Sequence, residues 1–494
     1  MKKLSTIFAI ALLVFITNCQ DFEEFQTDPN STTRANPGLL LTNIEINAFG
    51  SINLNAAMAC RYLVNVNLVN DFQYYGWDRA GFGVSDGSTQ TLYHLLRQVD
   101  KMEEEALRLD DENYQVLANF FRAYTYEQIT RQFGDIPFSA SIQAEEGVIT
   151  PAYDEQKNVY LGILSLLEEA NELIDPNSEA ISGDVVYNGD LSKWQKLINS
   201  YRLRVLMSLS LKENDPDLNL ATSFNEIFTN PTRYPIMESV EDNCQFTYSE
   251  ETGNTYPFWR SAAITTSYIF EESFVDRLKE FEDPRLFVMA DPEDIASGMD
   301  ELNFDSYNGF NGSAPFNENT TRLGLGEGSP LDERYIEDSE AEPNLALGYS
   351  ELSFTLAEAA NRGWISANAE DFYTEGIKAS MQFYNIDQTA VDTYLAQAEL
   401  QYNPTNGLEQ ILTQKYLAMF LNSGWEPFYN NRRTGIPEFD ISGGGTLNQG
   451  RVPKRWMYPI SEINLNQENL EAAIRRQYPE GDNINGVMWS IDPQ

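Results

Sequence analysis

Apolar residues recur at helical spacing in four long segments of the first half of the chain. These segments cover residues 88–109, a stretch ending at Gly134, and residues 155–174 and 190–211. Large apolar side chains three or four residues apart predict amphipathic α-helices. We expect these helices to form antiparallel pairs joined by short connections. Since no single pair can bury its apolar face alone, the pairs should stack in a curved array.

Helical patterns also occur on both sides of this block. Residues 36–70 predict one or two long helices that end near Asn70, and residues 348–384, 387–398 and 407–422 return to helical spacing. The chain then ends in a short extended piece and a last small helix. Paired helices of this length are typical of tetratricopeptide-like stacks, although no regular 34-residue sequence period is present.

Between residues 228 and 345 the helical periodicity fades. Proline, glycine, asparagine, aspartate and aromatic residues dominate there, with one clear helix near 265–281. A segment of this length is too long for a single structureless loop in a compact domain. We therefore predict a mainly α fold, in which a loop-rich subdomain lies on the helical stack.

The N-terminal stretch has the pattern of a secretion signal. Lys2 and Lys3 precede an apolar run from Leu4 to Ile16, which is shorter than the roughly 20 residues needed to cross a bilayer. Cys19 follows directly and resembles the lipidated cysteine of a loose lipobox. This predicts a signal peptide at 1–18, and a lipidated Cys19 with a polar linker at 19–35. The alternative is ordinary secretion with an incidental cysteine.

The net charge of −42 limits the classes of ligand. Nucleic-acid binding depends on lysine and arginine against phosphate, so this charge disfavours it. It also disfavours polyanionic polymers unless a local basic patch exists, and leaves neutral ligands as the easiest partners. An alternative interpretation is that this charge has no role in ligand choice and keeps a surface protein soluble.

Metal and thiol chemistry have little support in this sequence. Besides Cys19, Cys60 and Cys244 can either pair or remain two separate buried thiols, and the chain has no zinc-ligand spacing. The acidic run at 291–305 offers oxygen ligands for calcium but lacks the EF-hand spacing. We predict no cofactor and no metal site.

Two aromatic clusters outside the helical patterns are candidates for sugar binding, because a sugar stacks its C–H face on a ring and pairs its hydroxyls with polar side chains. Each cluster could instead pack its loop onto the scaffold. The first cluster comprises Asn70, Asp71, Tyr74, Tyr75, Trp77 and Arg79. The second cluster comprises Tyr256, Trp259, Tyr307 and Phe310.

One enzyme motif occurs, in the stretch Gly83–Gly87, which satisfies G-x-S-x-G. A nucleophile elbow needs a preceding buried strand and a histidine far downstream. Here a polar aromatic loop precedes Ser85, and the only histidine, His94, lies nine residues on. We therefore interpret the motif as a glycine-rich turn. Glycosidase chemistry needs two flanking carboxylates, and nothing in the sequence selects a pair.

Several strings resemble the SusD/RagB family of nutrient-binding outer-membrane lipoproteins, and in particular its second SusD-like subfamily. The strings are TDPN at 27–30, FGDIPF at 133–138, NGDLSKWQKLINSYRLR at 188–204, LAEAANRGW at 356–364, YTEGIKASM at 373–381, NNRRTGIPEF at 430–439 and RWMYPISEINLNQEN at 455–469. They extend over most of the mature chain.

The resemblance implies a SusD-like domain at 36–494. It would contain a helical stack at 36–227 and 346–425, a loop-rich ligand-binding part at 228–345 and a C-terminal segment at 426–494. It also implies a cell-surface lipoprotein that binds an oligo- or polysaccharide, delivers it to a SusC-like TonB-dependent transporter, and is not an enzyme. The alternatives are a peptide-binding RagB-like protein and a surface glycosidase or esterase.

Overall fold

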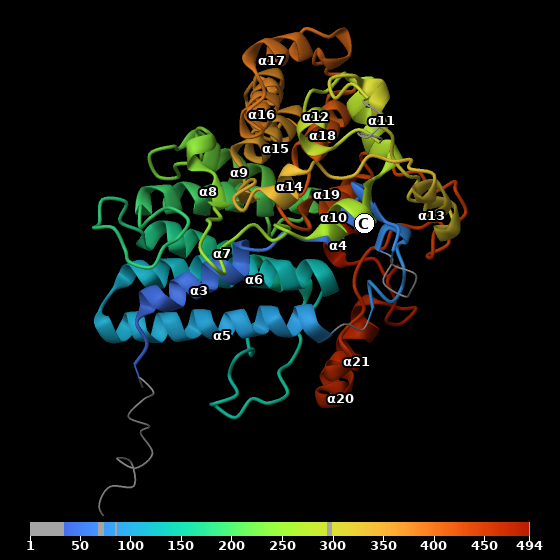
Figure 1. The fold of residues 1–494 in the computed structure, drawn as a ribbon. Helices are drawn as coiled ribbons and strands as arrows, with labels where there is room; N and C mark the ends of the chain where they lie inside the picture. Colours follow the sequence, from blue (N-terminus) through green and yellow to red (C-terminus); the bar gives the residue numbers. More distant parts are fainter. Residues whose placement is uncertain (1–33, 68–73, 84–85, 294–298, 494) are drawn as a thin grey trace, which may run out of the picture.

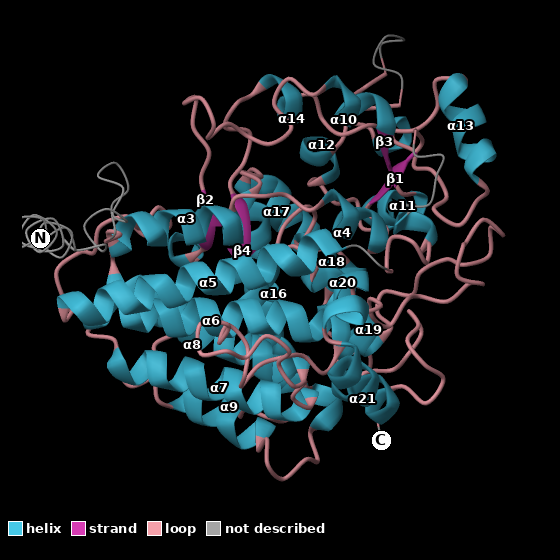
Figure 2. Ribbon diagram, turned by 90° about the horizontal axis from the view of Figure 1, so that it is seen from below, coloured by secondary structure: helices cyan, strands magenta, loops and turns pink. Residues whose placement is uncertain are grey.

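The computed structural model describes residues 34–67, 74–83, 86–293 and 299–493; Cys19, Asn70, Asp71 and Ser85 lie outside these ranges. The described chain is mainly helical, as predicted, with two small antiparallel sheets (Figures 1 and 2). In the described part, no helix is both long and apolar enough to span a bilayer.

The first helical block contains the four helices predicted from apolar spacing, and successive helices pack against one another (Figure 2). Its members are α5 (Asp86–Leu109), α6 (Glu112–Phe133), α7 (Gln156–Leu173), α8 (Leu191–Ser208) and α9 (Leu220–Thr229). Asp111 and Asp190 cap α6 and α8 with their side chains. Gly134, at a φ of +93°, ends α6 as expected. The prediction of short connections holds for α5–α6, whereas residues 134–155 and 174–190 form long loops.

The second block packs on the first through a contact between α15 and α8. It contains α15 (Tyr349–Asn361), α16 (Ala369–Phe383), α17 (Gln388–Leu395) and α18 (Gly407–Ala418). The chain then continues through α19 (Glu426–Thr434), α20 (Ile460–Leu465) and α21 (Gln467–Gln477).

The prediction for residues 36–70 is only partly correct. Two helices form, but they are short: α3 (Pro37–Phe49) and α4 (Leu54–Ala59). Arg61 adopts a φ of +64°, which is incompatible with a continuing helix. The chain then enters β1 (Leu63–Asn65), which pairs antiparallel with β3 (Tyr268–Phe270). This pairing partner is about two hundred residues away in the sequence, beyond the reach of a local pattern.

The loop-rich part contains more regular structure than the sequence indicates. The predicted helix near 265–281 is divided into α10 (Ala262–Ser267), strand β3 and α11 (Glu272–Glu280). A second sheet joins β2 (Cys244–Phe246) to β4 (Asn344–Leu347). The remaining helices are α12 (Leu286–Met289), α13 (Phe316–Gly324) and α14 (Arg334–Glu337). Short 3₁₀ turns are η1 (Tyr74–Gly76), η2 (Ser210–Lys212), η3 (Val240–Asp242), η5 (Phe304–Ser306), η6 (Ala398–Leu400) and η7 (Trp489–Ile491).

The core is rich in aromatic side chains. Trp194, Trp364 and Trp456 are buried and contribute large apolar surfaces to this core. Cys60 and Cys244 are two separate buried thiols, so the pairing alternative is wrong. Burial raises the pKa of both thiols, which keeps them protonated near neutral pH.

Candidate functional site

The first predicted sugar cluster does not present its largest ring to solvent. Trp77 has an exposed fraction of 0%. Its indole N–H donates to the carbonyl oxygen of Ala59 at 2.9 Å, and the guanidinium of Arg61 lies 4.1 Å from the ring centroid. The expectation of an exposed platform at Trp77 is therefore wrong. The loop turns inward because a buried carbonyl and a buried cation both find a partner in this ring.

The other described members of this cluster differ in exposure. Tyr75 is buried with Trp77, so it is not an exposed ring either. Tyr74 is half-buried and Arg79 is exposed, while Asn70 and Asp71 lie outside the described residues. Tyr74 packs against Trp425 with ring centroids 5.9 Å apart. The loop thus supports a ring that the sequence analysis did not nominate.

The second predicted cluster is also mostly internal. Tyr256, Tyr307 and Phe310 are buried, so the prediction that they are exposed ligand contacts is wrong. Tyr256 stacks on Tyr335, and the hydroxyl of Tyr307 donates to the carbonyl oxygen of Glu301 at 2.8 Å. These rings hold together a region with few long helices. Only Trp259 is half-buried, with Arg260 over its face at 4.0 Å.

A pocket of about 340 Å³ lies between α3, α5, α6, β4 and the start of α19. We call it the amide pocket, because side-chain amides dominate its polar lining. Its amide residues are Asn47, Asn53, Gln128, Gln132 and Asn344, and its aromatic residues are Phe49, Tyr124 and Trp425. Arg204 is the only charged side chain among the described lining residues, which include no aspartate or glutamate. The volume is within the range of small-ligand sites.

Helix α6 supplies one wall through a stripe at four-residue intervals. Tyr124, Gln128 and Gln132 share one face, since residues four apart are neighbours on a helix. Most other side chains of α6 are buried in the stack. Polar residues at this spacing on an otherwise buried helix were a sequence signal for the pocket, and our sequence analysis missed it.

Some of the amides are already engaged by the protein, and others remain available. Asn344 donates to the carbonyl oxygen of Phe49 at 2.7 Å, and the side-chain oxygen of Asn53 accepts from the N–H of Ala56 at 3.0 Å. Gln128 donates to Glu127 at 3.0 Å. The side-chain amide of Gln132 and the Nδ2 of Asn53 have no hydrogen bond to a described residue. These groups can donate to, and Gln132 can also accept from, a ligand hydroxyl.

Trp425 packs against four other aromatic rings. Its centroid lies 4.7 Å from that of Trp456 and 5.7 Å from that of Phe428, and Phe82 and Tyr74 pack beside it. Trp425 is half-buried although most of these neighbours are buried. A rigid, partly exposed indole at the edge of a polar pocket provides a stacking surface at low entropic cost.

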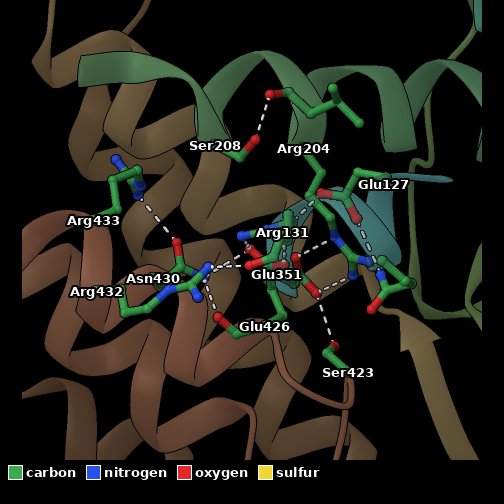
Figure 3. Close-up of polar contacts among 12 residues, drawn as sticks. Glu127, Arg131, Arg204, Ser208, Glu351, Ser423, Glu426, Asn430, Arg432 and Arg433 are labelled. Carbon is green, nitrogen blue, oxygen red and sulfur yellow. Dashed lines mark hydrogen bonds and ion pairs between the residues drawn. The ribbon is translucent and has the colours of Figure 1, made fainter. Parts of the chain in front are cut away.

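Buried ion pairs lie next to the pocket and include its lining residue Arg204 (Figure 3). Arg204 donates to both carboxylate oxygens of Glu351, at 2.7 and 2.5 Å, and Glu351 also accepts from the hydroxyl of Ser423 at 2.8 Å. This arrangement fixes residues 423–425 against α8. Burial alone would favour the neutral form of Arg204. The charge of Glu351 outweighs burial and raises the pKa of Arg204.

A second group in Figure 3 joins α6 to α19. Arg131 lies between two buried carboxylates and donates to Glu127 at 2.8 Å and to Glu426 at 2.5 Å. Burial raises the pKa of Glu127, whereas for Glu426 the charge of Arg131 outweighs burial and lowers the pKa. Since Gln128 donates to Glu127, this network also positions a side chain of the amide pocket.

The arginines of the NNRRTG string are structural. Arg433 pairs with Glu358, a carboxylate of helix α15, at 2.6 Å. Burial of Glu358 is outweighed by the charge of Arg433, which lowers the pKa of this carboxyl to about 2. Arg432 instead donates to the carbonyl oxygens of Lys454 and Arg131.

Metal coordination needs several ligand side chains in one place. In the described ranges, no three His, Cys, Asp or Glu side chains form a group that could hold a metal ion. Ser85 of the G-x-S-x-G stretch lies outside the described residues, and His94 is exposed on α5.

Comparison with known proteins gives consistent matches. The family described as "starch-binding associating with outer membrane", the second SusD-like family, matches residues 29–459. A SusD homologue from Bacteroides fragilis is similar at 35% identity and a TM-score of 0.84, over 93% of this chain and 100% of that one. A second SusD homologue from the same species is similar at 31% identity and a TM-score of 0.85, over 92% of this chain and 100% of that one.

The fold is shared more widely than these two structures. A chitin-binding protein matches with a TM-score of 0.75 over 92% of this chain and 100% of that one, at 24% identity, which shows a common fold alone. No curated protein sequence matches this chain.

Proposed function

Because this chain belongs to the SusD-like family of starch-binding proteins associated with the outer membrane, we propose that it captures a neutral oligo- or polysaccharide in the amide pocket. We further propose that it delivers this ligand to a SusC-like TonB-dependent transporter. The protein would then release the sugar to the transporter without breaking or forming a covalent bond in it. Binding and release would require no cofactor.

The observation that carries this proposal is the chemistry of the pocket lining. Amide side chains can donate to and accept from sugar hydroxyls, and Trp425 and Tyr124 offer ring surfaces for C–H faces. The guanidinium of Arg204 is already paired with Glu351. No charged group among the described lining residues is therefore free to bind a peptide terminus, which favours a neutral sugar over the peptide alternative.

Hydrolysis of the bound sugar is not part of the proposal. A glycosidase needs two carboxyl groups at the scissile bond, and none of the described lining residues of the amide pocket is acidic. The nearest carboxylate networks, around Glu351 and Glu127, are engaged by Arg204 and Arg131.

Replacing Trp425 by alanine should weaken sugar binding by about 1–3 kcal/mol, the scale known for stacking of nucleic-acid bases on aromatic side chains. Isothermal titration against a panel of neutral oligosaccharides and unmodified peptides measures this effect. The matched control is Trp259→Ala, another half-buried tryptophan, which lies in the second predicted cluster.

The two variants discriminate between the sites. Loss of affinity in Trp425→Ala alone supports the amide pocket, and loss in Trp259→Ala alone moves the ligand to the second cluster. Tight binding of peptides with no binding of any neutral sugar would reject the proposed ligand class. Both variants must keep the wild-type melting temperature to within a few degrees for the comparison to be valid.

The proposed location is the outer face of the outer membrane, with the protein anchored through lipid on Cys19. Two or more acyl chains anchor a protein stably, since each buried CH₂ contributes about 0.8 kcal/mol. We expect Cys19→Ala to move most of the protein from the membrane fraction to the soluble fraction. Incorporation of a labelled fatty acid that persists in this variant would contradict lipidation at Cys19.

A further inference from the structure

Helix α20 leaves its three apolar side chains exposed to solvent. None of its six residues is buried. Ile460, Ile463 and Leu465 are all exposed, with an exposed fraction of 72% at Leu465. All three lie within about one and a half turns of helix, so one partner can reach them, although Leu465 is on a different side of the helix from Ile463.

A loop from the first helical block extends this surface. Ile149 has an exposed fraction of 79%. Its neighbours are tied to the start of α21, because Asn466 donates to the carbonyl oxygen of Pro151 at 2.8 Å and Asn469 donates to that of Thr150 at 3.1 Å. We call the surface formed by Ile149, Ile460, Ile463 and Leu465 the α20 patch.

A pocket of about 310 Å³ opens beside the α20 patch. We call it the α20 pocket; rings and prolines dominate its lining, including Tyr93, Phe133, Pro137, Tyr153, Tyr458 and Pro459. Two hydrogen bonds hold its walls: Tyr153 donates to Glu462 at 2.6 Å, and Tyr93 donates to the carbonyl oxygen of Pro137 at 3.0 Å. Its shape is therefore fixed before a partner binds, which suits an apolar side chain of another protein.

The edge of the α20 pocket also carries a guanidinium. Arg97 and His94 line the pocket and are exposed on α5, and Glu462, which accepts a hydrogen bond from Tyr153, lines it as well. Neither Arg97 nor His94 forms an ion pair with a carboxylate in the described ranges. The guanidinium of Arg97 complements a partner segment that presents a carboxylate next to an apolar side chain.

The position of the α20 patch agrees with a partner in the membrane. In Figure 1, α20, α21 and the loop that carries Ile149 project from the lower edge of the molecule. The start of the described chain, before α3, leaves from the same edge. With the lipid anchor proposed at Cys19, which precedes that point in the sequence, we place this edge toward the membrane.

We propose that the α20 patch and the α20 pocket dock an extended segment of the transporter that carries an apolar side chain beside an acidic one. This inference rests on the proposed function, in which a SusC-like transporter is the partner. A lipid surface fits less well, because the pocket has a fixed shape and a strongly negative chain is repelled by anionic lipids.

The test places a photo-crosslinking amino acid at Leu465 of the full-length lipoprotein in cells of the native host. Leu325 is the matched control, since it has the same exposed fraction of 72% and lies at the end of α13. We expect a product from position 465 that mass spectrometry identifies as a TonB-dependent barrel, and at least five-fold less from position 325. Equal yields, products only with lipid or with another copy of this chain, or no product would overturn the proposal.

A second variant separates docking from ligand capture. Arg97→Glu should reduce the crosslink yield from position 465 at least three-fold, while the affinity of the purified protein for a neutral oligosaccharide stays unchanged. An unchanged yield would overturn the charge argument. If the purified wild-type protein binds no neutral oligosaccharide but the barrel is still crosslinked at position 465 only, the sugar proposal fails and the docking surface stands.

Discussion

Replacing Trp77 by alanine is expected to lower the free energy of unfolding by about 3–5 kcal/mol, the usual cost of removing a buried tryptophan. The ring is fully buried. Without its N–H, the carbonyl oxygen of Ala59 would lose its donor, and Arg61 would lose the ring beneath its guanidinium. Urea denaturation followed by circular dichroism measures the change.

Two further variants divide this effect into its parts. Trp77→Phe keeps most of the apolar volume but removes the hydrogen bond to Ala59. It should lower the free energy of unfolding by about 1 kcal/mol beyond the loss caused by the smaller ring, because the carbonyl of Ala59 is left without its donor. Trp259→Ala, at a half-buried site, should cost much less than Trp77→Ala. A Trp77→Ala protein with wild-type stability and weakened sugar binding would restore Trp77 as a ligand contact.

Trp77 shows why the sequence predicts the scaffold better than the site. The helices from α5 to α8 follow from apolar side chains three and four residues apart, because that spacing is a property of one short segment. The orientation of Trp77 depends instead on Arg61 and Ala59, which meet it only after the chain has turned at Arg61. An aromatic residue in a glycine-rich loop looks the same in sequence whether its ring faces inward or outward.

The amide pocket shows the same limit. Tyr124, Gln128 and Gln132 could have been found from their four-residue spacing, since they lie on one helix. Trp425 is separated from these residues by about three hundred positions in the sequence. It reaches them only because α19 packs against α8 and because the Trp425 ring packs against Trp456. The predicted loop lies next to the amide pocket, because Tyr74 packs against Trp425.

The last prediction concerns the ion pairs next to the pocket. Arg131→Met should lower the free energy of unfolding by about 3–5 kcal/mol at neutral pH, because it leaves two buried carboxylates, Glu127 and Glu426, without their shared cation. The control is Arg122→Met on the same helix. Arg122 pairs with the partly exposed Asp100 and Glu103, so its loss should cost less than about 1 kcal/mol.

The pH dependence of this deficit tests its electrostatic origin. Burial already raises the pKa of Glu127, and without Arg131 the pKa of Glu426 should rise as well. A carboxyl whose folded pKa exceeds its unfolded value of about 4.3 destabilises the fold as pH rises through the folded pKa. The Arg131→Met deficit should therefore be larger at pH 8 than at pH 5, and adding Glu426→Gln should recover part of it at pH 8. A deficit that is independent of pH would mean that Arg131 acts through packing alone, since a lost methylene contact does not titrate.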